Sequence, residues 1–267
     1  PALSLRWITW CQNAAGFPLT SFDTAENRLG TQMKATGEVM AIGRTFEESL
    51  LKAVRSLEIG VCHLHMPKFD PWTSEQLLDY VQEGRDDRIY AVTQLLRLGV
   101  DIGVTADRTK IDPFFLHKIQ AITAMETRLQ GAPYDVSVLR EAKAMGFSDS
   151  WVARLWRTEE LDVFDFRREH GLFPVYKMID TCASEFDSYV PYFYSTYEEE
   201  NESRVSEKEK ILVLGSGPIR IGQGVEFDYS TVHAVMTIRQ AGFEAIIVNN
   251  NPETVSTDFD IADKLYF

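Results

Sequence analysis

Cysteine is scarce in this sequence, and long apolar runs are absent. Its three cysteines, Cys11, Cys62 and Cys182, are odd in number and far apart, a pattern that predicts neither a disulfide framework nor a CxxC metal site. No apolar run approaches the ~20 residues of a membrane span, and the opening Pro1–Phe17 lacks the layout of a signal peptide. These absences disfavour a secreted disulfide scaffold and a membrane protein.

Basic residues are also in short supply. Lys and Arg number 27 against 40 Asp and Glu, which gives a net charge of −13. Such a surface disfavours general binding to DNA or RNA, where neutralising phosphates supplies most of the affinity, and it disfavours an anionic membrane surface. The 45% hydrophobic content is enough for a sizeable core. We therefore expect a globular, cytoplasmic protein of one to three domains.

Clear helix signals begin near residue 45. Gly37–Gly43 is predicted to be a short strand. Thr45 and Glu48 have the spacing of a capping box at the start of a helix. Gly60 is a natural stop for that helix.

Between about Cys62 and Tyr197 the pattern is mostly helical, with short loops, and it predicts a compact helical domain of about six helices. The predicted helices occupy residues 73–84, 86–99, 112–131, 135–146, 148–156 and 158–171. Residues 173–204 are rich in Tyr and Phe and have no helical period, so we expect an extended segment lying on its neighbours. The acidic run from Glu198 to Glu209 is typical of a solvated linker rather than a metal site.

Two features of this helical region invite a functional hypothesis that the rest of the sequence disfavours. The two short helices around Gly146 resemble a helix-turn-helix, but the acidic composition argues against a DNA-binding regulator. His63 and His65 lie two residues apart near Cys62, but no fourth ligand is in register, which favours plain structural residues over a metal site.

The chain changes character at Ile211. A buried strand, Ile211–Gly215, is followed by a helix over residues 226–242, a second strand over 244–251 and the start of a third at 264. This order predicts a parallel strand-helix-strand unit. Such a small sheet would leave an edge and faces uncovered, so we expect the C-terminus to fall inside a domain.

The segment ILVLGSGPIRIGQG leads from the first of these strands toward the helix through a glycine turn. Gly215 and Gly217 fit a dinucleotide fingerprint, but Arg220 stands at its third position and Gly222 comes two residues late. The second strand ends in Asn249–Asn251 rather than in an acid, and the Gly-Lys-Ser/Thr of a P-loop is missing. The pattern favours a structural corner over a nucleotide site, and both hypotheses stay open.

Polar side chains gather after both strands. They are Arg220, Gln223, Glu226 and Asp228 near the start of the helix, and Asn249–Asn251, Glu253 and Asp258 after the second strand. Because the carboxyl ends of parallel strands meet at one edge of a sheet, this arrangement predicts a polar crevice there. The alternative is that these groups cap the helix and bond to loop backbone.

Several long motifs resemble one family. GSGPIRIGQGVEFDYSTVHA and VNNNPETVSTDFDIADKLYF are similar to the start of the second synthetase half of the carbamoyl phosphate synthetase large subunit. TQMKATGEVMAIGRTFEESLLKAVRSLE resembles the end of the first half, and VYKMIDTCASEFDSYVPYFYSTYEEE resembles the close of the family's helical oligomerization domain. Together these motifs span most of Thr31–Phe267.

The resemblance implies a central fragment of a ligase. The family makes carbamoyl phosphate from bicarbonate, glutamine-derived ammonia and two MgATP, in arginine and pyrimidine biosynthesis. The resemblance also implies that the chain has three parts. Residues 1–61 would be the tail of the first ATP-grasp half, residues 62–202 the oligomerization domain, and residues 208–267 an incomplete, Rossmann-like pre-ATP-grasp unit. The expected fold is thus mixed, mainly α-helical, followed by a partial α/β unit. The expected partners are a glutaminase small subunit and further copies of the chain.

By resemblance, Glu226 and Glu253 match acidic positions that line the passage for the carbamate intermediate. Gly215, Gly217, Arg220 and Gln223 would form the supporting loop. We expect neither a catalytic residue nor a metal ligand in this segment. We also expect no bound cofactor, because ATP with magnesium or manganese would be bound by parts of the subunit outside this segment. The alternative is a free-standing helical interaction module with a small dinucleotide-binding unit.

Overall fold

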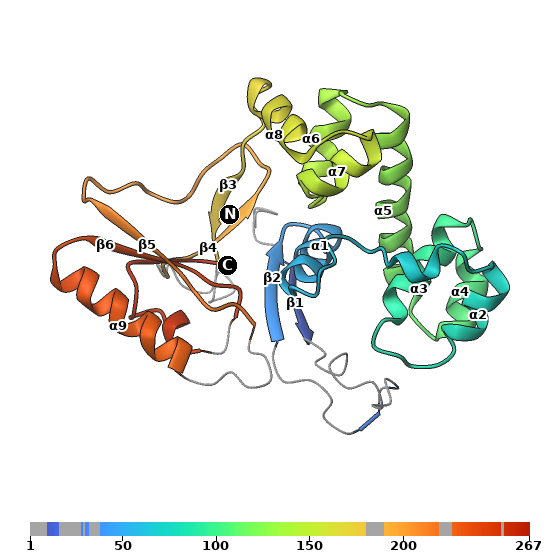
Figure 1. Ribbon diagram of the computed structural model, residues 1–267, viewed down its shortest axis with the longest axis horizontal. Helices are drawn as coiled ribbons and strands as arrows, with labels where there is room; N and C mark the ends of the chain where they lie inside the picture. Colours follow the sequence, from blue (N-terminus) through green and yellow to red (C-terminus); the bar gives the residue numbers. More distant parts are fainter. Residues whose placement is uncertain are drawn as a thin grey trace, which may run out of the picture.

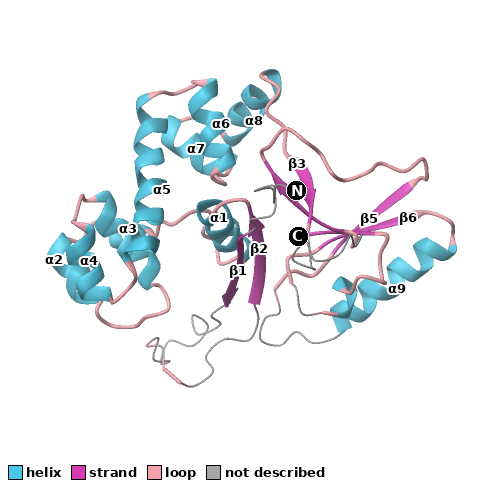
Figure 2. Ribbon diagram, turned by 180° about the vertical axis from the view of Figure 1, so that it is seen from behind, coloured by secondary structure: helices cyan, strands magenta, loops and turns pink. Residues whose placement is uncertain are grey.

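The computed structural model describes residues 10–15, 28, 30–31, 38–179, 190–218, 226–251 and 254–267. A small unit made of β1 (Trp10–Ala15), β2 (Glu38–Gly43) and α1 (Phe46–Ser56) lies between a group of helices and a mixed sheet (Figures 1 and 2). Strands β1 and β2 pair antiparallel, and α1 packs on both of them. The fold class predicted from the sequence, a helical domain followed by a partial α/β unit, is confirmed.

The helical part begins after α1 and runs to residue 169. Its helices are α2 (Ser74–Tyr80), α3 (Arg88–Arg97), α4 (Ile102–Thr109), α5 (Pro113–Gly131), α6 (Val136–Ala144), α7 (Asp149–Trp156) and α8 (Glu160–Glu169), with a short 3₁₀ turn η3 at Pro67–Phe69. No helix among the described residues combines the length and apolar character needed to cross a membrane.

Local capping explains why several of these helices start where they do. The Thr73 hydroxyl accepts the Gln76 N–H while the Gln76 side chain accepts the Thr73 N–H, so this predicted capping box is confirmed. Of the two hydrogen bonds that the predicted capping box at Thr45 requires, only one is present. Thr45 caps the N–H of Glu48, but the Glu48 carboxylate accepts the N–H of Arg44, at 2.7 Å, instead of that of Thr45.

Helix α4 is missing from the sequence prediction, which we correct here. Asp101 caps it by accepting the N–H groups of Gly103 and Val104. Its buried residues are threonines, Thr105 and Thr109, whose hydroxyls donate to carbonyls one turn earlier. Its apolar contacts with the core come from the partly buried Ile102 and Ala106 alone, which is too short an apolar stripe for a periodicity search to detect.

One hydrophobic core unites α1 with the helical part. It contains Phe46, Leu50, Leu51 and Val54 of α1 and continues through α2, α3 and α5–α8 to Leu172. Leu51, Leu116 and Leu139 are fully shielded from solvent, and each such side chain contributes roughly 2 kcal/mol. Helix α1 thus packs with the helices that follow it.

The second layer is a five-stranded sheet of order β3-β4-β7-β6-β5. Its strands are β3 (Val175–Met178), β4 (Tyr192–Thr196), β5 (Lys210–Leu214), β6 (Glu244–Val248) and β7 (Lys264–Tyr266), and α9 (Glu226–Gln240) connects β5 to β6. The neighbours β5, β6, β7 and β4 run parallel, while β3 is antiparallel to β4. The predicted parallel strand-helix-strand unit is confirmed.

Strands β3 and β4 come from the stretch that the sequence analysis treats as an extended segment within residues 62–202. The segment is extended, and it joins the C-terminal sheet: Tyr192 and Phe193 pair with Leu265 and Tyr266 of β7. The sheet therefore recruits strands from both sides of the linker at residues 198–209. Pairing over such a distance in sequence has no local signature.

Strand β5 departs from the prediction of a buried strand. It forms the edge of the sheet, and its side chains are largely open to solvent: Leu212 is 54% and Leu214 is 74% exposed. Apolar content alone cannot distinguish a central strand from an edge strand. The sequence predicts only three strands for this unit, and the described sheet has five, because β4 pairs with β7 and β3 pairs with β4.

Candidate functional site at the carboxyl edge of the sheet

The glycine turn and the asparagines after β6 meet at one edge of the sheet. Of the residues that the sequence analysis assigns to this site, Gly215, Gly217 and Glu226 are described, whereas Arg220, Gln223 and Glu253 lie outside the described residues. Gly215 follows β5 directly, and its N–H donates to the carbonyl of Val248 at the end of β6, at 2.8 Å. The corner is thus fixed by an extension of the strand pairing.

The space beside Gly215 is already occupied by another side chain of the protein. A Cβ on Gly215 would lie 2.5 Å from Cγ of Asn249, so only glycine fits here. Asn249 is 3% exposed, and its side-chain oxygen accepts the N–H of Asn251 at 3.2 Å. An asparagine from the neighbouring strand therefore occupies the place that a ligand would need in order to approach Gly215.

Gly217 is needed for its backbone conformation, and its nearest neighbour is Glu58. Gly217 has φ +72°, which glycine adopts at low cost. A Cβ there would lie 3.2 Å from Oε1 of Glu58, beyond the end of α1, and 3.5 Å from Oδ1 of Asn250. Both of these neighbouring atoms are oxygens that accept hydrogen bonds, whereas a phosphate group needs donors, so the position beside Gly217 is unfavourable for a phosphate. This geometry favours the structural corner over the dinucleotide site.

Asn250 joins this edge to the unit formed by β2 and α1. Its backbone carbonyl accepts the N–H of Met40 in β2, at 3.1 Å, and its side-chain amide donates to the carbonyl of Ser56, the last residue of α1, also at 3.1 Å. Its Oδ1 is buried and has no hydrogen-bond partner among the described residues. We call the contact of Met40, Ser56 and Glu58 with Gly217 and Asn250 the joint.

Charged side chains reinforce the contact between the β2–α1 unit and the sheet. The ammonium of Lys52 in α1 donates to the carbonyl of Ile42 at 2.9 Å and also to that of Ser195 in β4. Arg44, between β2 and α1, forms an ion pair with Glu198 at 2.7 Å. The small unit is therefore attached to the sheet by backbone, amide and charged contacts.

The start of α9 is tied to the loop that follows β6. The Asp228 carboxylate, 9% exposed, accepts the N–H of Ser256 at 3.0 Å. Ser256 lies in η4 (Val255–Thr257), three residues after Glu253, and Asp228 lies two residues after Glu226, which is exposed on the first turn of α9. The tie holds the segment next to Glu253 against the turn that carries Glu226.

A buried polar cluster lies elsewhere, in the helical part. His63, 1% exposed, bonds through Nε2 to Glu126 at 2.8 Å and stacks on Trp151 with ring centroids 4.5 Å apart. The guanidinium of Arg97 makes two 2.7 Å bonds to the same carboxylate. Burial lowers the pKa of His63 to about 4. Burial opposes ionisation of Glu126, but the bonds from Arg97 and His63 outweigh it and lower the pKa of Glu126 to about 2.

This cluster explains the histidines that the sequence offered as possible ligands. His63 is held by Glu126, while His65 bonds to Asp70 at 2.9 Å. Within the described ranges, no group of three or more His, Cys, Asp or Glu side chains is placed to hold a metal ion.

The glycine between α6 and α7 also has a packing role. Gly146 has φ +87°, and a Cβ there would lie 3.0 Å from Cα and from the carbonyl oxygen of Glu48 in α1. Its own carbonyl accepts a 2.7 Å bond from Arg55. The turn of the helix pair that resembles a helix-turn-helix is therefore packed against α1.

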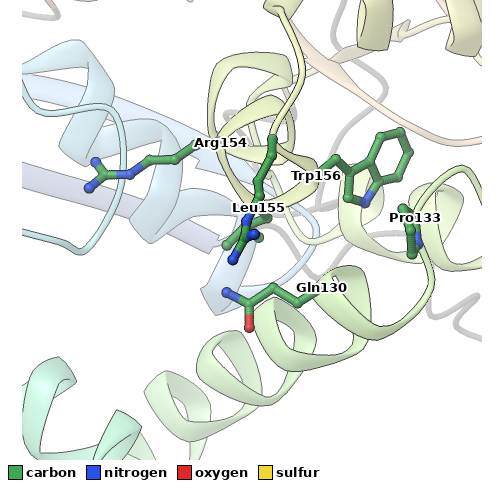
Figure 3. A pocket seen from close by; sticks show the side chains of 6 residues that line it. Gln130, Pro133, Arg154, Leu155 and Trp156 are labelled. Atoms are coloured by element: carbon green, nitrogen blue, oxygen red, sulfur yellow. The ribbon is translucent and has the colours of Figure 1, made fainter.

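A cavity of about 360 Å³ lies between the end of α5 and α7 (Figure 3). It is lined by Gln130, Pro133, Arg154, Leu155, Trp156 and Arg157. Figure 3 shows Arg154 pointing away from Gln130, and its guanidinium lies over the ring of Trp151 at 5.1 Å. None of the predicted site residues lines this cavity.

Sequence reasoning missed Glu58 and the bonding of Asn250. Glu58 was only part of a helix that was expected to stop at Gly60, whereas α1 ends at Ser56 and Glu58 itself takes a positive φ of 52°. The run of three asparagines after a strand was a usable signal, since amides at strand ends commonly bond to nearby backbone. The partner of Asn250, Ser56, lies 194 residues earlier, so no local pattern indicates it.

Comparison with known families assigns both parts of the chain. The model of the carbamoyl-phosphate synthetase large chain, oligomerisation domain, matches residues 38–171, which is 134 of the 267 residues and includes β2 and α1. The model of the carbamoyl phosphate synthase preATP-grasp domain matches residues 207–267. Both matches agree with the resemblance in the motifs, and the chain belongs to the carbamoyl-phosphate synthetase large-chain family.

Proposed function

We propose that this chain is the central segment of an ATP-dependent carbon–nitrogen ligase that makes carbamoyl phosphate from bicarbonate, glutamine-derived ammonia and two MgATP. The observation that carries the proposal is the order of the two family matches, an oligomerisation domain followed by a preATP-grasp domain on one chain. In the family, the oligomerisation domain follows the first synthetase half, and the preATP-grasp domain after it begins the second half. The enzyme would supply carbamoyl phosphate in the cytoplasm to arginine biosynthesis, to pyrimidine biosynthesis or to both.

The proposed division of the chain is the one that the motifs imply. Residues 1–61 end the first ATP-grasp half, 62–202 form the oligomerization domain and 208–267 begin the second half. Self-association through the helical part is supported by the description of the matching family domain. A glutaminase small subunit is the proposed second partner, as the source of ammonia.

At the carboxyl edge of the sheet we place the wall of the carbamate passage. Glu226 and Glu253 would face the intermediate, and Gly215, Gly217, Arg220 and Gln223 would shape the loop beside them. The tie between Asp228 and Ser256 supports this arrangement, because it draws the neighbours of the two glutamates together across the end of β6. Carboxylates there would orient the anionic intermediate through water.

The segment alone is proposed to be inactive, with the magnesium or manganese ATP sites in other parts of the subunit. The test is to incubate the purified 267-residue chain with bicarbonate, ammonia and MgATP. We expect no carbamoyl phosphate, and its formation would contradict the proposal. Calorimetry of the same chain with MgATP and with NAD should show no binding, whereas binding of NAD would favour a dinucleotide-binding module.

The passage itself is tested in the full-length subunit by Glu226→Gln and Glu253→Gln, with Glu75→Gln on the exposed face of α2 as the matched control. The measurement is the number of ATP molecules hydrolysed per carbamoyl phosphate formed, with ammonia as the nitrogen source. Loss of the intermediate from the passage should raise this ratio at Glu226 and Glu253 and leave the Glu75 variant unchanged. An unchanged ratio in all three variants would reject the passage.

A further inference from the structure

The cavity between the end of α5 and α7 lies apart from the carboxyl edge of the sheet, and it has one apolar and one polar side (Figure 3). Three apolar and three polar residues line it: Trp156, Pro133, Leu155, Gln130, Arg154 and Arg157. No acidic side chain is among the described residues that line it. Its volume of about 360 Å³ lies within the range of pockets that hold small molecules. In a chain with a net charge of −13, a hollow lined by two arginines without a carboxylate is suited to an anion.

Arg157 has no partner for its side chain within the part of the chain that the structure describes. The helix dipole favours a basic residue near a helix C-terminus, and Arg154 in the last turn of α7 has that position. Arg157 follows that turn, and across the described ranges its guanidinium makes no hydrogen bond or ion pair. Its five N–H donors are therefore available to a ligand in the cavity.

The backbone beside this cavity is strained at two positions. Four described non-glycine residues have a positive φ: Glu58, Lys110, Tyr134 and Arg157. Arg157, at +59°, lines the cavity, and Tyr134, at +60°, follows Pro133 and packs on Trp156 with ring centroids 4.8 Å apart. A residue with a Cβ is disfavoured in this conformation, and such residues cluster at ligand sites. Glycine would be the easier residue at position 157, so the presence of arginine indicates a use for its side chain.

We propose that this cavity binds the carboxylate of a small organic acid. The guanidinium of Arg157 donates to both carboxylate oxygens, because its planar fork matches their spacing. The side-chain amide of Gln130, which likewise has no bond to any described residue, donates a further hydrogen bond. The apolar body of the acid packs against Trp156 and Pro133. The inference is independent of the carbamate passage.

A small acid suits this site better than a carboxylate on a second copy of the chain. The cavity is a hollow between two helices of one chain, and such hollows hold compact molecules. An interface between two chains covers a far larger surface, of about 800 Å² on each partner. The test below distinguishes the two sources of a carboxylate.

The test is titration of the purified 267-residue chain with benzoate, with benzamide as the uncharged counterpart of the same shape. Calorimetry measures the affinity. The indole N–H of Trp156, which donates to the carbonyl of Leu129 at 3.0 Å, reports binding at this cavity by NMR. Melting temperature and sedimentation are measured for every variant.

Two substitutions at Arg157 and one control make the comparison. Arg157→Gly removes the guanidinium and relieves the backbone, whereas Arg157→Gln keeps a polar side chain without the charge. Lys110→Gly is the matched control, since Lys110 also has φ +59° and ends α4 with an N–H bond to the carbonyl four residues earlier, as Arg157 ends α7.

We expect benzoate to bind and to shift the Trp156 indole signal, and benzamide to do neither. Both Arg157 variants should weaken benzoate binding by about tenfold or more, since a charge-assisted pair is lost. The melting temperature of Arg157→Gly should equal or exceed that of the parent, and Lys110→Gly should bind benzoate as the parent does.

The inference is overturned if the parent does not bind benzoate, or if both Arg157 variants bind it with the parental affinity. Binding that leaves the Trp156 signal in place would locate the acid elsewhere and would also overturn it. Altered sedimentation of the Arg157 variants, with no benzoate binding by the parent, would assign the cavity to a second copy of the chain instead.

Discussion

The side-chain amide of Asn250 donates a hydrogen bond to the carbonyl of Ser56, 194 positions earlier in the chain, at 3.1 Å. It thereby satisfies one of the carbonyls that every helix leaves without a partner at its C-terminus. A side chain two residues beyond the end of β6 thus also satisfies the carbonyl of the last residue of α1. One amide connects the unit that packs with the helical core to the unit that carries the glycine turn.

This bond predicts a graded response at position 250. Asn250→Ala should lower the free energy of unfolding by about 1 kcal/mol, and Asn250→Asp by about 2–3 kcal/mol, because an aspartate oxygen would then face the Ser56 carbonyl and the Glu58 carboxylate. Chemical denaturation checks both values. Gln82→Ala is the control, since Gln82, exposed in the turn after α2, makes a similar amide-to-carbonyl bond to Leu78. A loss at Gln82 as large as that at Asn250 would contradict the role of the joint.

The close contact at Gly215 predicts that an added methyl group is not tolerated. Gly215→Ala would force Asn249 away from the turn, and we expect a loss of about 1–3 kcal/mol of stability. Gly84→Ala provides the comparison, because nothing lies within 4 Å of the point that its new methyl group would occupy and its φ is not positive. That variant should be neutral or stabilised by about 0.5 kcal/mol. Equal stability of the two variants, measured by urea denaturation, would show that the contact is not close in solution.

Acidification should destabilise the helical part in two steps. His63 has a folded pKa of about 4, below its ordinary 6.5, so the stability that comes from neutral His63 is present above pH 6.5 and is lost as the pH falls toward 4. Glu126, with a folded pKa of about 2 against 4.5, contributes stability above pH 4.5 that is lost as the pH falls toward 2.

The variant His63→Gln separates these steps. A glutamine amide can still donate to Glu126 but does not titrate, so the fall in unfolding free energy between pH 6.5 and 4 should shrink by on the order of 2 kcal/mol. The loss below pH 4.5 should remain. Denaturation at pH 7, 5.5 and 4 makes the comparison, with His117→Gln on the exposed face of α5 as control. The same pH dependence in the parent and in His63→Gln would reject the assignment.

The tie between α9 and the loop after β6 can be probed at Asp228. Asp228→Ala leaves the buried N–H of Ser256 without an acceptor and should cost about 1–3 kcal/mol. The backbone amides of Ser256 and its neighbours should also exchange hydrogen faster in this variant than in the parent protein, and this change is more specific to the lost bond than the change in stability. Asp260→Ala, at an exposed position in the same loop, should leave both quantities unchanged. Unaltered exchange at Ser256 in the Asp228 variant would show that the loop is held by other contacts.

Local chemistry made much of the helical part predictable. Thr73 with Gln76, and Asp112 followed by Pro113, mark helix starts by side-chain capping and by a fixed φ, and the structure has both. The sequence does not predict α4, because its fully buried residues are threonines. It predicts β5 as a buried strand, because an apolar composition does not reveal that a strand lies at the edge of a sheet. Interactions between near neighbours in sequence could be predicted, and burial by distant partners could not.

The candidate site shows the same division. Gly215 and Gly217 could be identified as a turn from their place after an apolar run, and the structure explains each glycine by a separate contact. Those contacts come from Asn249, just after β6, and from Glu58, beyond the end of α1. The choice between a nucleotide turn and a structural corner depends on these partners, so the sequence pattern left both open.

The strand order has a consequence for the growing chain on the ribosome. Strand β4 is flanked by β3, its neighbour in sequence, and by β7, which is made only when residues 264–266 have been translated. The helical core from Phe46 to Leu172 is complete long before then and can fold during synthesis. During that interval the β3–β4 hairpin carries an unpaired edge, which is a template for wrong pairing. Slow translation after β4 would therefore favour aggregation, and a chaperone that covers this edge would favour the native sheet.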